Sequence, residues 1–232
     1  MRRIKNKLLL TAKQITSPIH SRKLYHRFIH NDVPYYSQWE SRELVEQFIT
    51  KKMDVRADPK WKNSGASNVD EYAAWSWNGC GMACLKMILA VSGQVVPLVE
   101  LGKASVKHGV YQLPLEDSPG MFYKPFVKFI EQEYGIHSKS NSSLTIAEIK
   151  RTLSKDGFII ASVTPEIRFP ELTPTKRGGH LVLLIGFDDE KNVFYLHNPS
   201  GYKGTQENVE VAYDKFSQFF DHKGIEISSK KA

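Results

Sequence analysis

Residues 80–92 constrain the fold more than any other part of the sequence. Lys86 is the only charged residue among them, and the other positions are apolar or small almost all the way round a helix. Such a helix is stable only when protein surrounds it on every side. Gly93 follows, where a glycine commonly ends a helix. The sequence therefore predicts a central helix that is buried by the elements on either side of it.

The pattern along the rest of the chain predicts helices first and strands later. Apolar stripes at helical spacing indicate amphipathic helices at residues 42–53 and 122–134. Thr145 and Glu148 form a capping box, which begins a helix running to about residue 155. Shorter helices are expected at 70–77 and 213–220, and strands at 158–163, 181–187, 193–197 and 225–227. This order is an α+β plan, and a length of 232 residues favours one large domain.

The net charge of +7 comes from one end of the chain. Residues 1–30 contain eight Lys and Arg residues and no acid, so residues 31–232 together carry −1. Proteins that bind nucleic acid present a basic surface on the folded domain, and none is expected here. Nucleic acid is therefore not predicted as a partner. Residues 1–30 are interpreted as a basic tail, and residues 31–228 as the folded domain.

Two interpretations of the basic tail remain open. The preferred one is a solvated tail, whose removal leaves the fold intact. The alternative is a weak contact with an acidic membrane surface, because several apolar residues fall near one helical face. The apolar run in this tail is too short for a signal peptide. No stretch of the chain approaches the roughly 18 apolar residues of a membrane span, so a cytoplasmic protein, at most peripheral to a membrane, is expected.

Cys80 is the first candidate for chemistry. It lies between Gly79 and Gly81 at the start of the central helix, where free backbone N–H groups and the helix dipole stabilise a thiolate. We expect these effects to lower its pKa and make it a nucleophile. The competing interpretation is a buried structural cysteine. Cys84, one turn further into the helix, is assigned that structural role.

His180 and Asn198 are the next candidates. His180 follows two glycines and begins an apolar strand, and a turn at residues 188–192 leads to the next strand. A hairpin closed symmetrically about residue 189 would set His180 opposite Asn198, with Cβ atoms roughly 4.5–5.5 Å apart. The Asn198 amide oxygen would then hold the imidazole, while His197 would face the other way. A nucleophile, a base and an orienting group are therefore present. The alternative for His180 is a solvated loop residue.

The same residues suggest one competing site, a zinc site. Cys80, Cys84, His180 and His197 are all of the types that ligate zinc. However, the spacing of the two cysteines is not usual for such a site. Strand alternation also separates the two histidines. No metal or other cofactor is therefore predicted.

These motifs resemble those of a known family. Residues 78–88 are similar to the nucleophile helix of the bacteriocin-processing cysteine peptidases, the double-glycine-leader peptidases of cysteine peptidase family thirty-nine. Residues 178–180, followed by an apolar strand that ends Gly-Phe-Asp-Asp, resemble their histidine motif. Residues 197–199 resemble the element that supplies the third residue, and residues 33–38 are similar to the opening strand of stand-alone members. The resemblance spans about residues 32–200.

The resemblance implies a papain-like fold, in which a buried N-terminal helix carrying the cysteine packs on an antiparallel sheet carrying the histidine and asparagine. It implies that Cys80 is the nucleophile, His180 the general base, Asn198 the orienting residue and Gln38 a donor in the oxyanion hole. Asn stands where Asp is more usual in the family. In addition, 41 residues separate Gln38 from Cys80, far more than in compact members. Asn78 is therefore the alternative donor.

Residues 39–77 form an insertion that contains four tryptophans, Trp39, Trp61, Trp75 and Trp77. It is interpreted either as a lid or as a packed insertion that does not touch substrate. The absence of a phosphate-loop motif favours a free-standing peptidase over an exporter. The expected function is a thiol hydrolase that cleaves peptide or protein substrates through an acyl-enzyme. The alternatives are acyl or peptidyl transfer on the same triad and a non-catalytic peptide-binding module.

Overall fold

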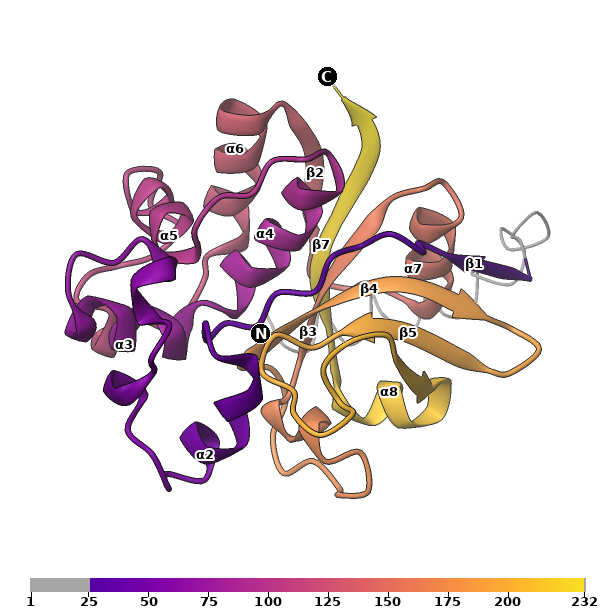
Figure 1. The fold of residues 1–232 in the computed structure, drawn as a ribbon. Coiled ribbons are helices and arrows are strands. Elements are labelled where there is room, and N and C mark those ends of the chain that lie inside the picture. The colour runs from indigo at the N-terminus through magenta and orange to yellow at the C-terminus, as the bar shows by residue number, and fades with distance from the viewer. Residues whose placement is uncertain (1–25, 232) are drawn as a thin grey trace, which may run out of the picture.

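The computed structural model describes residues 26–231, which form a group of helices packed against an antiparallel sheet (Figure 1). The helices are α2 (Val45–Ile49), α3 (Val69–Asn78), α4 (Cys80–Val91), α5 (Leu98–Val106), α6 (Tyr123–Tyr134), α7 (Ile146–Leu153) and α8 (Tyr213–Phe219). The strands are β1 (Arg27–Ile29), β2 (Ile136–Asn141), β3 (Phe158–Val163), β4 (His180–Asp188), β5 (Val193–His197), β6 (Val209–Ala212) and β7 (Phe220–Lys231). Short 3-10 turns lie at Arg42–Leu44, Val55–Ala57, Trp61–Ser64, Leu115–Asp117 and Pro165–Arg168.

The sheet runs in the order β2-β7-β3-β4-β5-β6, and every neighbouring pair is antiparallel. β4 is central, and all nine of its residues are buried. One edge of β4 pairs with β5. The other edge pairs with β3 over residues 180–184 and with β1 over residues 186–188. β1 therefore extends the edge of β4 that β3 leaves open.

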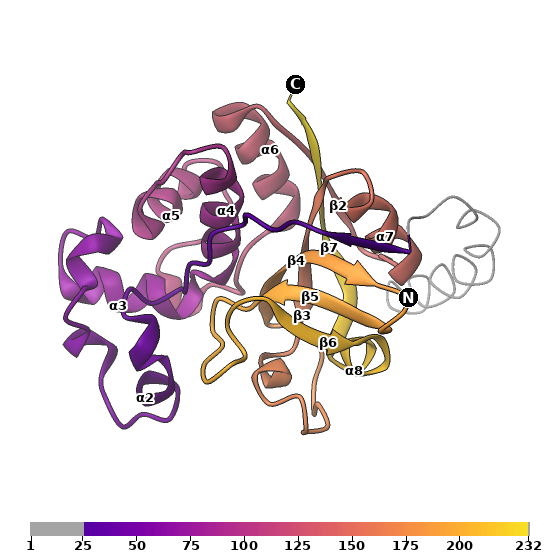
Figure 2. The same cartoon turned by 45° about the vertical axis from the view of Figure 1, so that its right-hand side comes forward.

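Helices cover both faces of the sheet (Figure 2). Leu181 and Leu183 of β4 belong to the core cluster that includes residues of α4, α5 and α6. Val182 and Leu184, which alternate with them, belong to the cluster formed with α7 and α8. The strand is apolar on both faces because each face contributes to a separate core.

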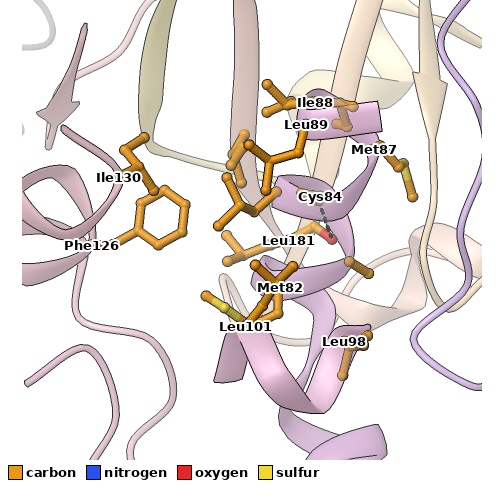
Figure 3. Packing of buried hydrophobic residues seen from close by; sticks show 14 of the residues in the cluster. Met82, Cys84, Met87, Ile88, Leu89, Leu98, Leu101, Phe126, Ile130 and Leu181 are labelled. Atoms are coloured by element: carbon orange, nitrogen blue, oxygen red, sulfur yellow. Dashed lines mark hydrogen bonds between the residues drawn. The ribbon is translucent and has the colours of Figure 1, made fainter. Parts of the chain in front are cut away.

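The central helix α4 is buried as its composition predicts. Residues 81–89 are all buried, and apolar side chains surround the helix in Figure 3. Lys86 remains tolerable inside because its Nζ atom lies 3.9 Å from Glu40 Oε1 and 4.6 Å from the centre of the Tyr36 ring. Helix and antiparallel sheet together confirm the predicted α+β plan, with a buried helix packed on the sheet.

The inserted segment has a small core of its own. A third buried cluster consists of Trp39, Val45, Phe48, Val55, Tyr72 and Ala73. The buried carboxylate of Asp58 accepts hydrogen bonds from the Ser41 hydroxyl (2.6 Å), the Ser41 backbone N–H (3.1 Å) and the Tyr72 hydroxyl. These contacts pack this part of the insertion.

The folded part begins earlier than residue 31, where the sequence suggested it would. Residues 27–29 form β1, and the His30 ring stacks on Phe158 with centroids 4.1 Å apart. His30 Nε2 also donates to the Gly157 carbonyl oxygen at 2.9 Å. Pairing with the sheet therefore begins at residue 27, four residues before the expected boundary. The charged segment before residue 26 lies outside the described residues, as does most of the predicted membrane-contacting face.

This boundary gives a testable prediction. Deleting residues 1–25 should leave the midpoint of thermal unfolding unchanged, because this segment holds most of the excess positive charge and none of the predicted site residues. Deleting residues 1–30 should lower the free energy of unfolding by about 2 kcal/mol, since Phe28, Ile29 and His30 leave apolar surface uncovered. Chemical denaturation of the two truncations measures the difference. Equal stabilities would show that β1 does not contribute to the fold.

No helix within residues 26–231 is long and apolar enough to cross a lipid bilayer.

Candidate active site

Cys80 and His180 line the same cavity. The cavity has a volume of about 140 Å³, and its other walls include Trp77, Asn78 and Met121. Cys80 is the first residue of α4 and is partly exposed, whereas His180 is the first residue of β4 and is buried. Because α4 packs directly on β4, the ends of these two elements meet. A larger hollow of about 370 Å³ between β2, α7 and β7 contains neither cysteine nor His180.

His180 and Asn198 are in direct contact. The distance from His180 Nε2 to Asn198 Oδ1 is 2.8 Å. An amide oxygen only accepts hydrogen bonds, so Nε2 carries the ring proton. The other ring nitrogen, Nδ1, is then the one able to accept a proton.

The predicted register that brought these two residues together is wrong. β4 and β5 pair Asp188 with Val193 and Gly186 with Tyr195, but the register shifts by one residue between Leu184 and Gly186. Ile185 is thus the extra residue of a β-bulge, and the pairing ends at Leu183 and His197. Asn198 therefore lies past the end of β5 rather than opposite His180.

The bulge explains why the two side chains nevertheless meet. Continued by one residue, the pairing of Leu183 with His197 would set Asn198 opposite Val182, which shares a face with His180. Without the bulge, Asn198 would have been opposite Leu183, which faces the other way. A one-residue irregularity places Asn198 on the side of His180.

Sequence reasoning missed two residues next to this pair, Ser200 and Arg168. Ser200 Oγ lies 2.9 Å from His180 Nε2 and 3.2 Å from Asn198 Oδ1. Arg168 Nε donates to Ser200 Oγ at 2.8 Å and to the Ser200 carbonyl oxygen at 2.9 Å. The contact between Arg168 and Ser200 spans 32 residues of sequence. No local pattern signals it.

His180 is a neutral imidazole. Burial, followed by the positive charge of Arg168, lowers its pKa from 6.5 to about 3, and the hydrogen bond to Asn198 opposes this shift only partly. Above about pH 4 the ring is therefore uncharged and able to accept a proton.

The pKa of Cys80 differs in direction from the one predicted. Burial raises it above its ordinary value, although the backbone of Leu181 and Gly81 and the charge of Arg168 lower it. Burial outweighs the local effect of the helix terminus. Among the described residues, no hydrogen bond links the Cys80 sulfur to His180. Burial raises the pKa of Cys84 much further, so Cys80 is the more acidic of the two thiols.

The two candidate oxyanion donors lie in different surroundings. Gln38 is buried, and its Nε2 atom donates to the Ser76 carbonyl oxygen at 2.7 Å. Its Oε1 atom has no hydrogen-bond partner among the described residues. Gln38 does not line the cavity of Cys80, whereas Asn78 does. Asn78 is thus the candidate that reaches the cavity, and its Nδ2 atom also donates to the Ala74 carbonyl oxygen at 3.0 Å.

The residues of the competing zinc site do not gather at one point. His197 is fully buried, donates from Nε2 to the Val33 carbonyl oxygen at 2.9 Å, and accepts at Nδ1 from the Asn208 backbone N–H at 3.1 Å. Cys84 Sγ lies 3.9 Å from the Leu181 carbonyl oxygen. Within residues 26–231, no group of three or more His, Cys, Asp or Glu side chains is arranged to hold a metal ion.

The environments of the two thiols predict unequal reactivity. Brief exposure to iodoacetamide at neutral pH should label Cys80 at least tenfold faster than Cys84. Cys84 is fully buried, and its pKa is raised further, so both access and thiolate fraction favour Cys80. Peptide mapping by mass spectrometry measures the two rates. Faster labelling of Cys84 would contradict the assignment of Cys80.

Comparisons with known proteins give the family and the fold. A family model, the Peptidase_C39 like family, matches residues 30–224. A crystal structure of a C39-like peptidase from Bacillus anthracis is 15% identical, covers 89% of this chain and 99% of its own, and superposes with a TM-score of 0.53. The peptidase domain of Streptococcus ComA, a bifunctional ABC transporter involved in a quorum-sensing pathway, is also 15% identical, with coverage of 66% and 93% and a TM-score of 0.43.

A third structure, xylellain, a cysteine protease from Xylella fastidiosa, is 16% identical, with coverage of 91% and 88% and a TM-score of 0.39. None of the curated proteins compared with this chain matches it. The fold is that of the C39-like peptidase from Bacillus anthracis. Since the family model matches most of the sequence, this chain belongs to the Peptidase_C39 like family.

Proposed function

We propose that this protein is a cysteine peptidase that cleaves peptide bonds through an acyl-enzyme, with Cys80 as nucleophile, His180 as general base and Asn198 as orienting residue. One observation carries the proposal. The ring of His180, held by Asn198 at 2.8 Å, lines the cavity that also contains the partly exposed thiol of Cys80. Membership of the Peptidase_C39 like family supports the same chemistry.

The proposed reaction begins with transfer of the Cys80 proton to His180 Nδ1. The thiolate attacks the carbonyl carbon of the scissile peptide bond, and the carbonyl oxygen becomes an oxyanion. The C–N bond then breaks as His180 gives its proton to the leaving amine. Water, deprotonated by His180, attacks the thioester and releases the acid product with the thiol restored.

The start of α4 is suited to holding the oxyanion. Its first backbone N–H groups have no partner within the helix and carry the positive end of the helix dipole. Asn78, which lines the same cavity, is the proposed side-chain donor, with Gln38 as the second candidate. Preorganised donors of this kind stabilise a tetrahedral intermediate in acyl transfer.

The proposed catalytic domain begins near residue 26, and the insertion of residues 39–77 belongs to it. Of the four tryptophans in that insertion, Trp77 lines the cavity of Cys80 and is 49% exposed. Trp77 is therefore proposed to contact the substrate peptide. Trp39 and Trp75 are buried and hold the insertion in place.

The test of this function is the intact mass of the protein after treatment with a peptide vinyl sulfone, an electrophile that reports on an activated thiol. Wild type should gain the mass of one molecule, as should the Cys84→Ser control. Cys80→Ala should gain none. A wild-type protein that binds peptides but gains no mass would support a non-catalytic peptide-binding module instead.

A further inference from the structure

Arg168 is a cation beside the candidate active site, and Glu166 of the same 3-10 turn is a carboxylate that acts on it through its charge. Arg168 ends this turn, Pro165–Arg168, and its burial lowers its own pKa. Among the described residues it forms no ion pair. Its Nε atom instead donates to both the hydroxyl and the carbonyl oxygen of Ser200. A single N–H group is thus shared between two acceptors of the same residue.

Ser200 connects this cation to the candidate catalytic pair. Its side chain is fully buried, and its Oγ atom lies within hydrogen-bond distance of Arg168, His180 and Asn198. Its backbone N–H also donates to Asn198 Oδ1 at 3.1 Å. Ser200 therefore fixes the Asn198 side chain through two separate atoms.

The direction of each hydrogen bond follows from the chemistry of the donors. Arg168 only donates, so a lone pair of Ser200 Oγ faces it. Asn198 Oδ1 only accepts, so the Ser200 proton is directed there, at 3.2 Å. The remaining lone pair of Ser200 then faces His180 Nε2 at 2.9 Å. Both neighbours of Nε2 are acceptors, and the ring proton is confined to that nitrogen.

We propose that Arg168 and Ser200 are positioning residues of this active site: Arg168 orients the Ser200 hydroxyl, and Ser200 with Asn198 keeps the His180 proton on Nε2. Nδ1 is then left free to take the proton of Cys80. This inference rests on the proposed function. It adds two residues that act on the tautomer of the base and do not touch the reacting atoms.

The charge of Arg168 acts on the same site. It lowers the pKa of His180 and the pKa of Cys80. The other titratable groups that interact with Cys80 are Cys84, Tyr111 and Tyr123. Their pKa values are all raised, that of Tyr123 to about 12, so these groups are neutral near pH 7. Among the described side chains, Arg168 is therefore a charged group that lowers the pKa of Cys80 and so raises its thiolate fraction, against the larger effect of burial.

Two variants separate the hydrogen bonds from the charge. Ser200→Ala removes the hydroxyl and retains the charge, and we expect vinyl sulfone labelling to slow about tenfold, the effect of one hydrogen bond. Arg168→Gln removes the charge, so the pH at half-maximal labelling should rise because the pKa of Cys80 rises. Arg168→Lys, which retains a charged donor, should restore much of the wild-type pH profile. Arg177→Gln is the matched control, because Arg177 donates to the Phe220 carbonyl oxygen and to none of the site residues.

The tautomer itself is measured by nitrogen NMR of His180. In wild type the proton should be on Nε2, and in Ser200→Ala and Arg168→Gln the two tautomers should mix. Melting curves identify any variant that fails to fold, and Ser200→Ala carries the test if Arg168→Gln is that variant. If folded Ser200→Ala or Arg168→Gln keeps both the Nε2 tautomer and the wild-type labelling profile, the inference is wrong while the proposed function stands. If wild type shows no Cys80-dependent labelling, the proposed function fails, and the NMR result still decides whether Arg168 and Ser200 set the tautomer.

Discussion

Replacing Asn198 with alanine should slow thiol labelling and peptide cleavage by about a hundredfold or more while the protein remains folded. The variant removes the oxygen that accepts from His180 Nε2 at 2.8 Å. The ring is then free to rotate and to change tautomer, and Nδ1 no longer points reliably at the thiol proton. The loss of stability should be smaller, about 1–3 kcal/mol, because the backbone N–H of Ser200 also loses its acceptor.

Two further variants make this prediction specific. Asn198→Asp retains an acceptor oxygen and should recover a large part of the rate. His197→Gln changes the adjacent residue, and a glutamine amide is able to replace both hydrogen bonds that His197 forms with Val33 and Asn208. It should leave labelling within a few-fold of wild type. Labelling rates and melting curves for all three variants test whether Asn198 is the orienting residue. If His197→Gln is the slow variant, the assignment of Asn198 is wrong.

Replacing Gly201 with alanine should destabilise the protein by about 3 kcal/mol or more. A Cβ atom at this position would lie 1.8 Å from the Thr205 carbonyl oxygen, a backbone atom that is unable to move aside cheaply. The loop is also fixed by hydrogen bonds from the Gly201 N–H to the Asn198 carbonyl oxygen and from the Asn198 N–H to the Gln206 carbonyl oxygen. Relief of the clash would therefore displace Asn198, and labelling should be lost together with stability.

Gly204→Ala is the matched control in the same loop. Gly204 has a positive φ of 85°, but a Cβ atom there meets nothing within 4 Å. Its cost should be limited to the backbone strain of about 1–2 kcal/mol. Urea unfolding of both variants, with labelling measured in parallel, tests the difference. Equal stabilities for the two variants would show that the loop adapts to a side chain at position 201.

The elements that were predicted correctly carry their signal in a few adjacent residues. The helix α4 was recognised because Lys86 is its only charged residue. The helix α7 was recognised because Thr145 and Glu148 form the capping box that begins it. α5 was missed because Gly102 lowers the helical propensity of its sequence. The structure gives a reason for that glycine: a Cβ atom there would lie 2.5 Å from the Trp75 ring. Close packing against Trp75 therefore requires a glycine in α5, and this glycine hides the helix in the sequence.

The missed strands are held by their partners rather than by their own composition. β2 has a polar sequence and lies at the edge of the sheet, where it pairs with β7. β1 has three residues and pairs with β4, more than 150 positions further along the chain. The predicted strand at residues 33–38 is instead an irregular segment, whose Gln38 backbone N–H donates to the Pro199 carbonyl oxygen. None of these three segments therefore has both the alternation of apolar and polar residues and the length by which a strand is recognised in a sequence.

In the candidate site, too, features with a local sequence signal were predicted, and features that depend on packing were not. Cys80, His180 and Asn198 were proposed from motifs, and the pKa of Cys80 was predicted in the wrong direction. Helix position is visible in a sequence, whereas the depth of burial depends on every element packed around the thiol. Arg168 and Ser200 were missed for a related reason. Arg168 contacts Ser200, and Ser200 contacts His180, only after the turn that contains Arg168 has folded against the end of the sheet.

The bulge at Ile185 determines which changes in chain length the hairpin tolerates. Insertions in the turn at residues 189–192 leave both strands in their present register, and we expect them to be accepted. Deletion of one residue at the bulge would restore regular pairing toward the site and exchange the sides of His197 and Asn198. Deletion of two residues would leave His197 and Asn198 on their present sides of the sheet but would shorten the strand. Homologous hairpins should therefore vary freely in the turn, while the stretch between the bulge and His180 keeps a fixed length.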